Sequence, residues 1–328
     1  MMAELKTTYM GLELRNPVMV ASSGLTGNIE GVKKAEGAGA GAVVLKSIFE
    51  EQIDAEVAQI TAQSWMPGHA EAFDYVHGMG YALTPVKYLD LVSQARDAVS
   101  IPVIASLNCI SGKWWTDYAE KIEQAGAHGL ELNISVMPSD PKRTSNDVEG
   151  IYYDIVESVK SRIKIPVAVK LGSCFTALGH TAGELSKRGA DALVLFNRFY
   201  SLNIDIEKME VTAGYPFSSS GDMSHTLRWV ALLAGRIDAD IAASTGIHDA
   251  SDVVKLILAG AGVVEMASAL YTKGMEHIET VLEGLQKWMD KHGLTSLDEF
   301  RGRLSQERAD NPELYDRLQY IKAIVGLE

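Results

Sequence analysis

Four segments of the chain share one pattern, in which a helical stretch ends at a Gly-Ala pair and a short apolar run follows. They span residues 37–46, 124–133, 187–196 and 258–267. Because glycine commonly ends helices, each segment is typical of a helix end that leads into a buried strand. Further apolar runs lie at 16–24, 101–108, 165–172 and 239–246. The pattern therefore predicts eight strands.

The eight runs are apolar on both faces, as in parallel strands that are covered on both sides. Amphipathic segments predicted to be helices separate several of them, at 116–125, 152–163, 182–188 and 249–259. Eight strands, each followed by a helix, in 328 residues favour a (β/α)₈ TIM barrel of the α/β class over a doubly wound open sheet. We expect one domain that spans residues 1–328.

Two connections are too long to be simple loops. Residues 49–83 follow the second predicted strand, and residues 198–224 follow the sixth. Both insertions leave the carboxyl ends of strands, which form the reaction face of a barrel, so we expect lids or substrate walls. The C-terminal tail, about 296–328, is predicted to be helical, with a break near Asn311-Pro312 and a role in packing.

Polar side chains follow nearly every predicted strand, at the ends that meet in one mouth of a barrel. They are Ser22, Ser23, Lys46, Ser47, Asn108, Asn133, Ser135, Lys170, Asn197, Arg198, Ser244, Thr245 and Ser268. This ring predicts a ligand rich in hydrogen-bonding atoms. Lys46 and Lys170 each end an apolar run, where an ammonium needs a partner. A bound anion or cofactor edge would supply one, and so would an ion pair with a loop carboxylate.

The net charge of -13 disfavours nucleic acid and anionic membranes as partners, because a basic surface is what gains from releasing their counterions. A small, anionic substrate remains compatible with local positive charge. Cys109 and Cys174 are too few for a disulfide framework, and we interpret them as free thiols that fill small buried gaps. The sequence shows no membrane-length apolar run, signal-peptide pattern, zinc-ligand spacing or Walker A loop, so we expect a cytoplasmic protein without a metal site.

The seventh and eighth strands are followed by "STGIHD" (244–249) and "ASALY" (267–271). Small residues before a helix let backbone N–H groups approach a phosphate, and barrels often bind phosphate at these two turns. The asparagines at the other strand ends suit the edge of a planar heterocycle. Together these features outline flavin mononucleotide (FMN), although composition alone fits other phosphorylated ligands equally well.

Eight motifs, taken in order, resemble the dihydroorotate dehydrogenases, especially the class 1 enzymes. They are "NPVMVASSGLTG" (16–27), "VLKSI" (44–48), "HGMGY" (77–81), "ELNIS" (131–135), "VKL" (169–171), "STGI" (244–247), "GAGVVEMASALYTKG" (260–274) and "SLDEFRG" (296–302). The resemblance spans nearly the whole chain. It implies an FMN-binding (β/α)₈ barrel, an oxidoreductase of pyrimidine biosynthesis and a homodimer.

The resemblance also implies roles for individual residues. Lys46 corresponds to the lysine near flavin and substrate, Lys170 to the lysine at the polar end of the flavin ring, and Asn108 and Asn133 to asparagines that face both ligands. The remaining flavin positions are Ser22, Ser23, Ser244, Thr245, Gly246, Ala267 and Ser268, with Thr245 and Ala267 in place of glycines. The substrate positions are Met79, Gly80, Asn133, Asn197 and Arg198, where Arg198 replaces a serine.

In that family a hydride passes to the flavin, and a cysteine or serine on the loop after the fourth strand removes a proton. The matching position here holds Val136, or Met137 if one residue is inserted, and neither side chain accepts a proton. Ser135 lies one residue before this position, and because neighbouring residues of an extended segment face opposite ways, its side chain is expected to point elsewhere. His77, which replaces an asparagine, titrates near neutrality and suits either a base or a substrate donor. The catalytic candidates are therefore Lys46, Ser135 and His77.

Arg198 favours a substrate that carries a carboxylate or phosphate, and a surface ion pair would explain it equally well. Three functions remain open. The first is an FMN-dependent oxidoreductase that acts on dihydroorotate or a related small cyclic substrate. The second is a flavin-binding barrel without dehydrogenase activity, serving as a regulatory or partner-bound subunit. The third is a flavin-free lyase that uses Lys170 as a Schiff-base nucleophile.

Overall fold

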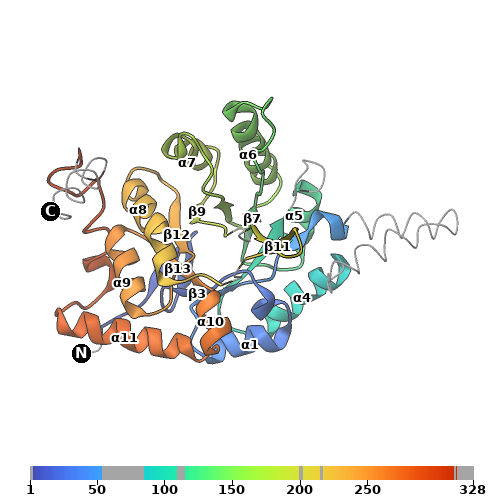
Figure 1. Ribbon diagram of the computed structural model, residues 1–328. Coiled ribbons are helices and arrows are strands. Elements are labelled where there is room, and N and C mark those ends of the chain that lie inside the picture. Colours follow the sequence, from blue (N-terminus) through green and yellow to red (C-terminus); the bar gives the residue numbers. More distant parts are fainter. Residues whose placement is uncertain are drawn as a thin grey trace, which may run out of the picture.

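The computed structural model describes residues 3–53, 85–108, 115–198, 202–214, 217–313 and 315. Eight parallel strands form a closed barrel (Figure 1). In chain order they are β3 (Val18–Val20), β4 (Ala42–Val44), β6 (Val103–Asn108), β7 (Gly129–Asn133), β8 (Val167–Leu171), β9 (Ala192–Leu195), β12 (Asp240–Ser244) and β13 (Val263–Met266). The β13–β3 and β4–β6 pairings close the ring. The eight predicted strands and the TIM barrel are confirmed.

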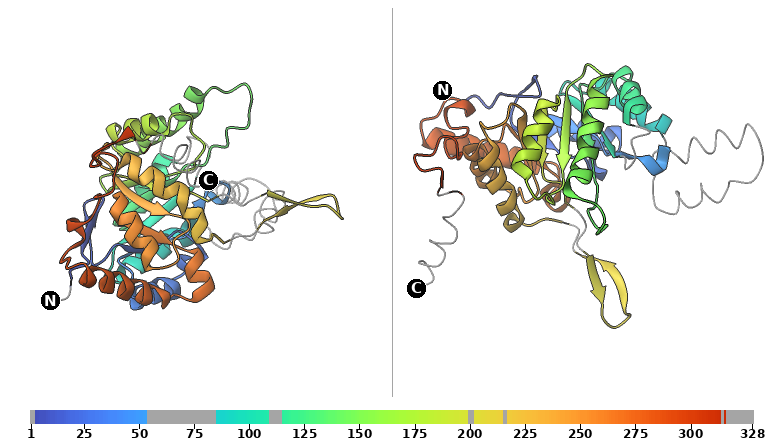
Figure 2. Two further views of the ribbon diagram at one scale, coloured as in Figure 1. Left: turned by 60° about the vertical axis from the view of Figure 1, so that its left-hand side comes forward. Right: turned by 90° about the horizontal axis from the view of Figure 1, so that it is seen from above.

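Helices follow the strands and surround the barrel (Figures 1 and 2). They are α1 (Ile29–Gly37), α4 (Pro85–Ala98), α5 (Trp115–Gln124), α6 (Ser145–Lys160), α7 (Leu178–Lys187), α8 (Met223–Leu233), α9 (Ala250–Ala259), α10 (Ser268–Lys273) and α11 (His277–Lys291). The four predicted helices correspond to α5, α6, α7 and α9. In the described part of the chain, no helix combines the length and the apolar character needed to cross a membrane.

Helix α6 starts at Ser145, well before the predicted start at residue 152. The reason is a capping box, in which Thr144 Oγ1 accepts a hydrogen bond from the Asp147 backbone N–H at 3.3 Å. The Asp147 carboxylate accepts one from the Thr144 backbone N–H at 2.8 Å. These two bonds satisfy free backbone donors and stabilise a polar first turn. That turn carries no apolar periodicity, so a prediction from periodicity alone begins too late.

The amino-terminal end of the barrel is filled by apolar side chains. An antiparallel hairpin of β1 (Thr7–Tyr9) and β2 (Leu12–Leu14) packs there. Its buried Tyr9 and Leu14 belong to one cluster with the interior-facing Met19 of β3. A second and larger apolar cluster joins the outer strand faces to the helices. Polar side chains inside the barrel therefore lie toward its carboxyl end.

The two long insertions are described by the structure to different extents. The first contains β5 (Ile48–Phe49), which extends the sheet beside β6, and its residues 54–84 lie outside the described part. The second forms an antiparallel hairpin of β10 (Leu202–Asp205) and β11 (Glu210–Ala213) that projects away from the barrel (Figure 2). Among the described residues of this insertion, Arg198 at its start and Phe217 and Ser218 near its end line the cavity described below.

The predicted helical tail is wrong over residues 296–313. Leu297–Glu299 form a short 3-10 helix, and the chain then runs through a series of turns to residue 308. The backbone here donates hydrogen bonds to the ends of other helices, from Gly302 to the Ile257 carbonyl at 2.9 Å and from Leu304 to the Leu258 carbonyl at 2.8 Å. These tertiary bonds replace the bonds of a regular helix. Residues 316–328 lie outside the described part.

Candidate functional site at the carboxyl end of the barrel

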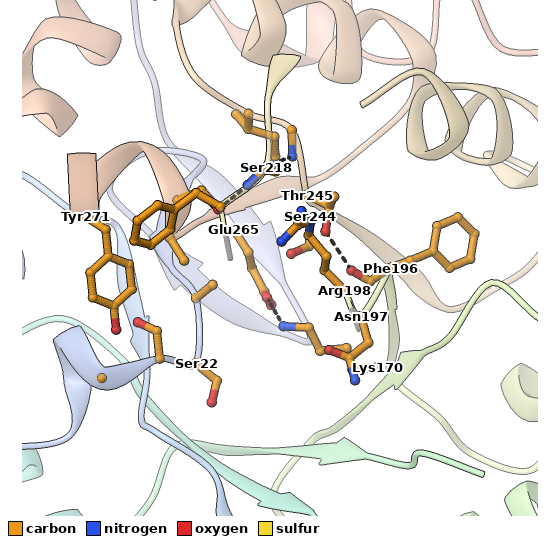
Figure 3. A pocket seen from close by; sticks show the side chains of 18 residues that line it. Ser22, Lys170, Phe196, Asn197, Arg198, Ser218, Ser244, Thr245, Glu265 and Tyr271 are labelled. Atoms are coloured by element: carbon orange, nitrogen blue, oxygen red, sulfur yellow. Dashed lines mark hydrogen bonds and ion pairs between the residues drawn. The ribbon is translucent and has the colours of Figure 1, made fainter. Parts of the chain in front are cut away.

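A cavity of about 500 Å³ opens among the loops that follow the strands (Figure 3). This volume lies in the range of pockets for small molecules and cofactors. Ten of the predicted site residues line it: Ser22, Ser23, Lys170, Asn197, Arg198, Ser244, Thr245, Gly246, Ala267 and Ser268. Eight others were not predicted: Ala21, Gly24, Phe196, Phe217, Ser218, Ile247, Glu265 and Tyr271.

The remaining candidates lie beside the cavity or outside the described residues. Asn133 is buried and accepts a hydrogen bond from Asn197 Nδ2 at 2.9 Å, which places it directly behind a lining residue. Lys46, Asn108 and Ser135 are partly exposed at the ends of their strands and do not line the cavity. The predicted His77, Met79 and Gly80 fall in residues 54–84, and Cys109 falls in residues 109–114; both segments lie outside the described part of the chain.

Lys170 is fixed at the inner wall of the cavity by two glutamates from the strands. Its Nζ donates a hydrogen bond to Glu265 Oε2 at 2.8 Å and lies 3.5 Å from Glu131 Oε1. All three side chains are buried. The predicted partner was a loop carboxylate or a ligand, so the strand carboxylates correct that part of the prediction. A glutamate in an otherwise apolar strand, as in "LEL" and "VVEM", was the signal that could have revealed them.

The neighbouring charges in this cluster shift the pKa values of Glu131 and Lys170. Burial, reinforced by repulsion from Glu265, raises the pKa of Glu131 to about 8. Burial opposes the charge of Lys170, but attraction to Glu131 and Glu265 outweighs this effect and raises the lysine pKa. Glu131 therefore exchanges a proton near neutral pH, under the influence of both neighbouring charges. A lysine held so firmly in its protonated form is a poor Schiff-base nucleophile, which weighs against the lyase hypothesis.

The turn after β12 keeps the backbone shape that glycine would give it. Thr245 has a φ of +77° and Gly246 a φ of +78°. The Thr245 hydroxyl stabilises this strained conformation by donating a hydrogen bond to the Phe196 carbonyl at 3.1 Å. The Gly246 backbone N–H donates to Ser218 Oγ at 3.2 Å. Thr245, which stands where the resemblance implies a glycine, thus adopts a positive φ that glycine favours, and the Ala267 φ of -139° requires no glycine.

The opposite wall presents an aromatic surface beside small residues. The rings of Phe217 and Tyr271 lie 5.4 Å apart at 30°. A Cβ added to Gly24 would come within 2.6 Å of the Tyr271 hydroxyl, so a larger residue there would require the tyrosine side chain to shift. Ser23 Oγ is buried and has no hydrogen-bond partner among the described residues. An aromatic face and a free polar atom beside one cavity fit a planar ligand with polar edges.

The loop after β7 carries no proton acceptor at the expected position. Val136 is half-buried, and its backbone N–H lies 3.4 Å from the Tyr152 hydroxyl. Met137 is exposed, and both residues border a separate small cavity that also includes Cys174. Cys174 is itself exposed, so its predicted role as a buried filler is wrong. The loop that carries Cys174 places this side chain at the surface rather than in the core.

Comparison with known proteins gives a consistent result. The profile of the family described as "Dihydroorotate dehydrogenase" matches residues 76–289. A protein of Aeropyrum pernix, assigned as a dihydroorotate dehydrogenase A (fumarate), is 28% identical over 91% of this chain and 97% of its own. The dihydroorotate dehydrogenase B (NAD(+)) catalytic subunits of Thermoplasma acidophilum and Pyrococcus furiosus are 27% and 28% identical, over 92% and 91% of this chain and 99% and 98% of theirs.

Proposed function

Because the chain belongs to the dihydroorotate dehydrogenase family, we propose that it is an FMN-dependent oxidoreductase of pyrimidine biosynthesis, acting on dihydroorotate or a related small cyclic substrate. The observation that carries this proposal is the cavity itself, which combines a buried ammonium, an aromatic wall and two small-residue turns. The proposal covers residues 1–328 as one cytoplasmic barrel domain that forms a homodimer.

The lining residues fit FMN in three regions. Phe217 and Tyr271 would contact an apolar part of the ligand, Ser22, Ser23 and Lys170 would meet polar atoms of the ring, and the turns at 244–246 and 267–268 would hold the phosphate. When bound, the flavin supplies the acceptor for a hydride. The chain's own contribution is to place a cation at the ring edge and to restrict the approach of water.

The substrate would bind over the polar residues after β7 and β9. Asn197 and Asn133 are joined by a hydrogen bond of 2.9 Å, so they present fixed donors and acceptors. Arg198 lines the cavity and favours an anionic substrate. Lys46, Ser135, His77, Met79 and Gly80 complete the proposed substrate and catalytic set on the basis of the family resemblance.

The direct test is anaerobic mixing of the FMN-loaded protein with dihydroorotate. We expect the flavin absorbance to bleach, and we expect Asn197→Ala to slow the bleaching by about 10- to 100-fold, since one polar substrate contact is lost. A flavin-loaded protein that no dihydropyrimidine reduces would reject the dehydrogenase proposal. It would favour the second hypothesis, a flavin-binding barrel without dehydrogenase activity. The observation behind that alternative is the apolar pair Val136 and Met137 at the position of the family base.

A further inference from the structure

From the cavity wall inward, six side chains form a continuous polar chain across the barrel interior. Three serines lead inward from the cavity, and we call Ser22, Ser47 and Ser106 the serine relay. Their hydroxyl oxygens are 3.0 Å apart between Ser22 and Ser47 and 2.8 Å apart between Ser47 and Ser106. Ser106 Oγ then donates to Glu131 Oε1 over a longer 3.5 Å. Lys170 and Glu265 complete the chain at 3.5 Å and 2.8 Å.

The hydrogen bonds of the relay can all be donated in the same direction, from Ser22 toward Glu131. The Ser106 hydroxyl donates to Glu131, which leaves its oxygen free to accept from Ser47. Ser47 can in turn accept from Ser22, whose oxygen also accepts the Ser47 backbone N–H at 3.0 Å. Every hydroxyl both donates and accepts, so a proton that enters at Ser22 can be passed along to the Glu131 carboxylate.

The relay connects a closed interior to an open cavity. Ser47, Ser106 and Glu131 are buried, with exposed fractions of 6%, 0% and 1%. Ser22 is partly exposed and lines the cavity, whereas Glu131 does not line it. Among the described residues, Glu131 is linked to the cavity along the relay, through Lys170, and through Glu265, which lines the cavity and interacts with Glu131. A lysine that remains protonated has no site for a further proton. Of the other two routes, the serine relay is the one joined by a hydrogen bond at every step.

Few other titratable groups face this carboxyl. Lys170 of β8 and Glu265 of β13 contact it or interact with its charge, as described above. Tyr88 of α4 donates its hydroxyl to the Ser106 carbonyl, and Tyr9 of β1 lies near both glutamates. Burial raises the pKa of both tyrosines, and the glutamate charges raise it further. Both phenols therefore stay neutral, and Glu131 is the group that changes charge near neutral pH.

We propose that Glu131 is a proton store for the cavity. In its ionised form, the Glu131 carboxylate takes up one proton when negative charge is added beside Lys170, and it gives the proton back when that charge is removed. The proton moves between Glu131 and the cavity along the serine relay. The physical cause is electrostatic, because an anion beside Lys170 competes for the ammonium that otherwise compensates two carboxylates.

The source of the added charge rests on the proposed function. A hydride carries two electrons and one proton, so a flavin that had accepted one from a substrate C–H bond would hold one added negative charge. One proton from bulk water would then form an O–H bond on Glu131 and offset that charge.

The first test needs no flavin. Infrared difference spectra of the apoprotein between pH 6 and pH 10 should show a protonated buried carboxyl that is lost with a midpoint near pH 8. Glu131→Gln should remove this band. Glu265→Gln should keep it and move its midpoint to lower pH, because one repelling charge is gone. A band that is unchanged in Glu131→Gln, or missing from the wild-type protein, would overturn the proposal even if the flavin assignment holds.

The second test uses the FMN-loaded protein. Above pH 8 the wild-type midpoint potential should fall more steeply with pH than that of Glu131→Gln, by about 30 mV per pH unit, which is one proton per two electrons. Equal slopes in the two proteins would contradict the store. A failure to bind flavin would instead reject the proposed function and leave the apoprotein result standing.

The third test separates the store from its route. Proton uptake that follows reduction can be timed with a pH-indicator dye in a weakly buffered solution. Ser106→Ala and Ser47→Ala should keep the amount of proton taken up and slow its uptake by at least about tenfold. Ser305→Ala, an equally buried serine outside the chain, should change neither quantity. Unchanged rates in both relay variants would overturn the route.

Discussion

At the scale of single residues, Lys170 keeps its charge inside the barrel because Glu131 and Glu265 compensate it. The sequence predicted that this lysine needs a partner, since it ends an apolar strand. It did not identify Glu265, which lies 95 positions away, because local patterns contain no information on which side chains meet across a closed barrel. The two asparagines that bond to each other, Asn133 and Asn197, were both predicted, but their contact was not, for the same reason.

Replacing Lys170 should be costly. We expect Lys170→Met to lower the free energy of unfolding by about 3–5 kcal/mol, because two buried carboxylates lose their partner. Urea denaturation at pH 8 measures the loss. The matched control is Lys160→Met, whose 2.7 Å ion pair with Asp191 is partly exposed and should contribute at most about 1 kcal/mol. Equal losses of unfolding free energy in the two variants would show that the buried cluster stabilises the protein no more than the partly exposed ion pair does.

The buried carboxyl also predicts a pH dependence of stability. The folded pKa of Glu131 is about 8, against an ordinary value of 4.5, so between these values the folded protein keeps a proton that the unfolded chain has released. The contribution of Glu131 to the free energy of unfolding is fully present below pH 4.5. It is lost as the pH rises to about 8, and the loss is on the order of 4 kcal/mol. Glu131→Gln should lack this decrease. Denaturation midpoints at pH 5, 6.5 and 8 test it, and parallel curves for the two proteins would refute it.

At the scale of elements, sequence patterns located the strands well and the polar termini of helices less well. Buried strands carry a continuous apolar signal, and all eight were found from such runs, four of them directly after Gly-Ala. Helix α6 begins earlier than predicted because Thr144 and Asp147 stabilise its first turn through polar bonds. The tail after Ser296 was predicted to be helical because its side chains favour helix, yet its backbone bonds instead to α8 and α9.

The turn after β12 depends on Gly246. A Cβ there would come within 2.3 Å of the Met223 backbone nitrogen at the start of α8, and its φ is +78°. We expect Gly246→Ala to destabilise the protein by about 3 kcal/mol or more and to weaken FMN binding, because the turn and α8 must separate. Gly293→Ala has a similar φ of +67° with no atom within 4 Å, so strain alone should cost about 1–2 kcal/mol. Similar thermal shifts in both variants would contradict this account.

At the scale of the whole molecule, the closed barrel divides its interior into an apolar end and a polar end. The β1–β2 hairpin and its neighbours fill the amino-terminal end, and the cavity with Lys170 lies at the carboxyl end. The overall arrangement and ten of the lining residues were predictable, because every parallel strand delivers its last residue to the same face. The aromatic wall was not, since Phe217 closes a long insertion and Tyr271 lies within α10, where no strand pattern marks them.

The most direct measurement of the central claim is the binding of FMN to the purified apoprotein, followed by equilibrium dialysis and flavin absorbance. We predict one FMN per chain, an affinity reduced by about 10- to 100-fold in Lys170→Met because a charged hydrogen bond is lost, and an unchanged affinity in Lys160→Met. A wild-type protein that is colourless as purified and takes up no added FMN would contradict the account, as would equal affinities in all three proteins.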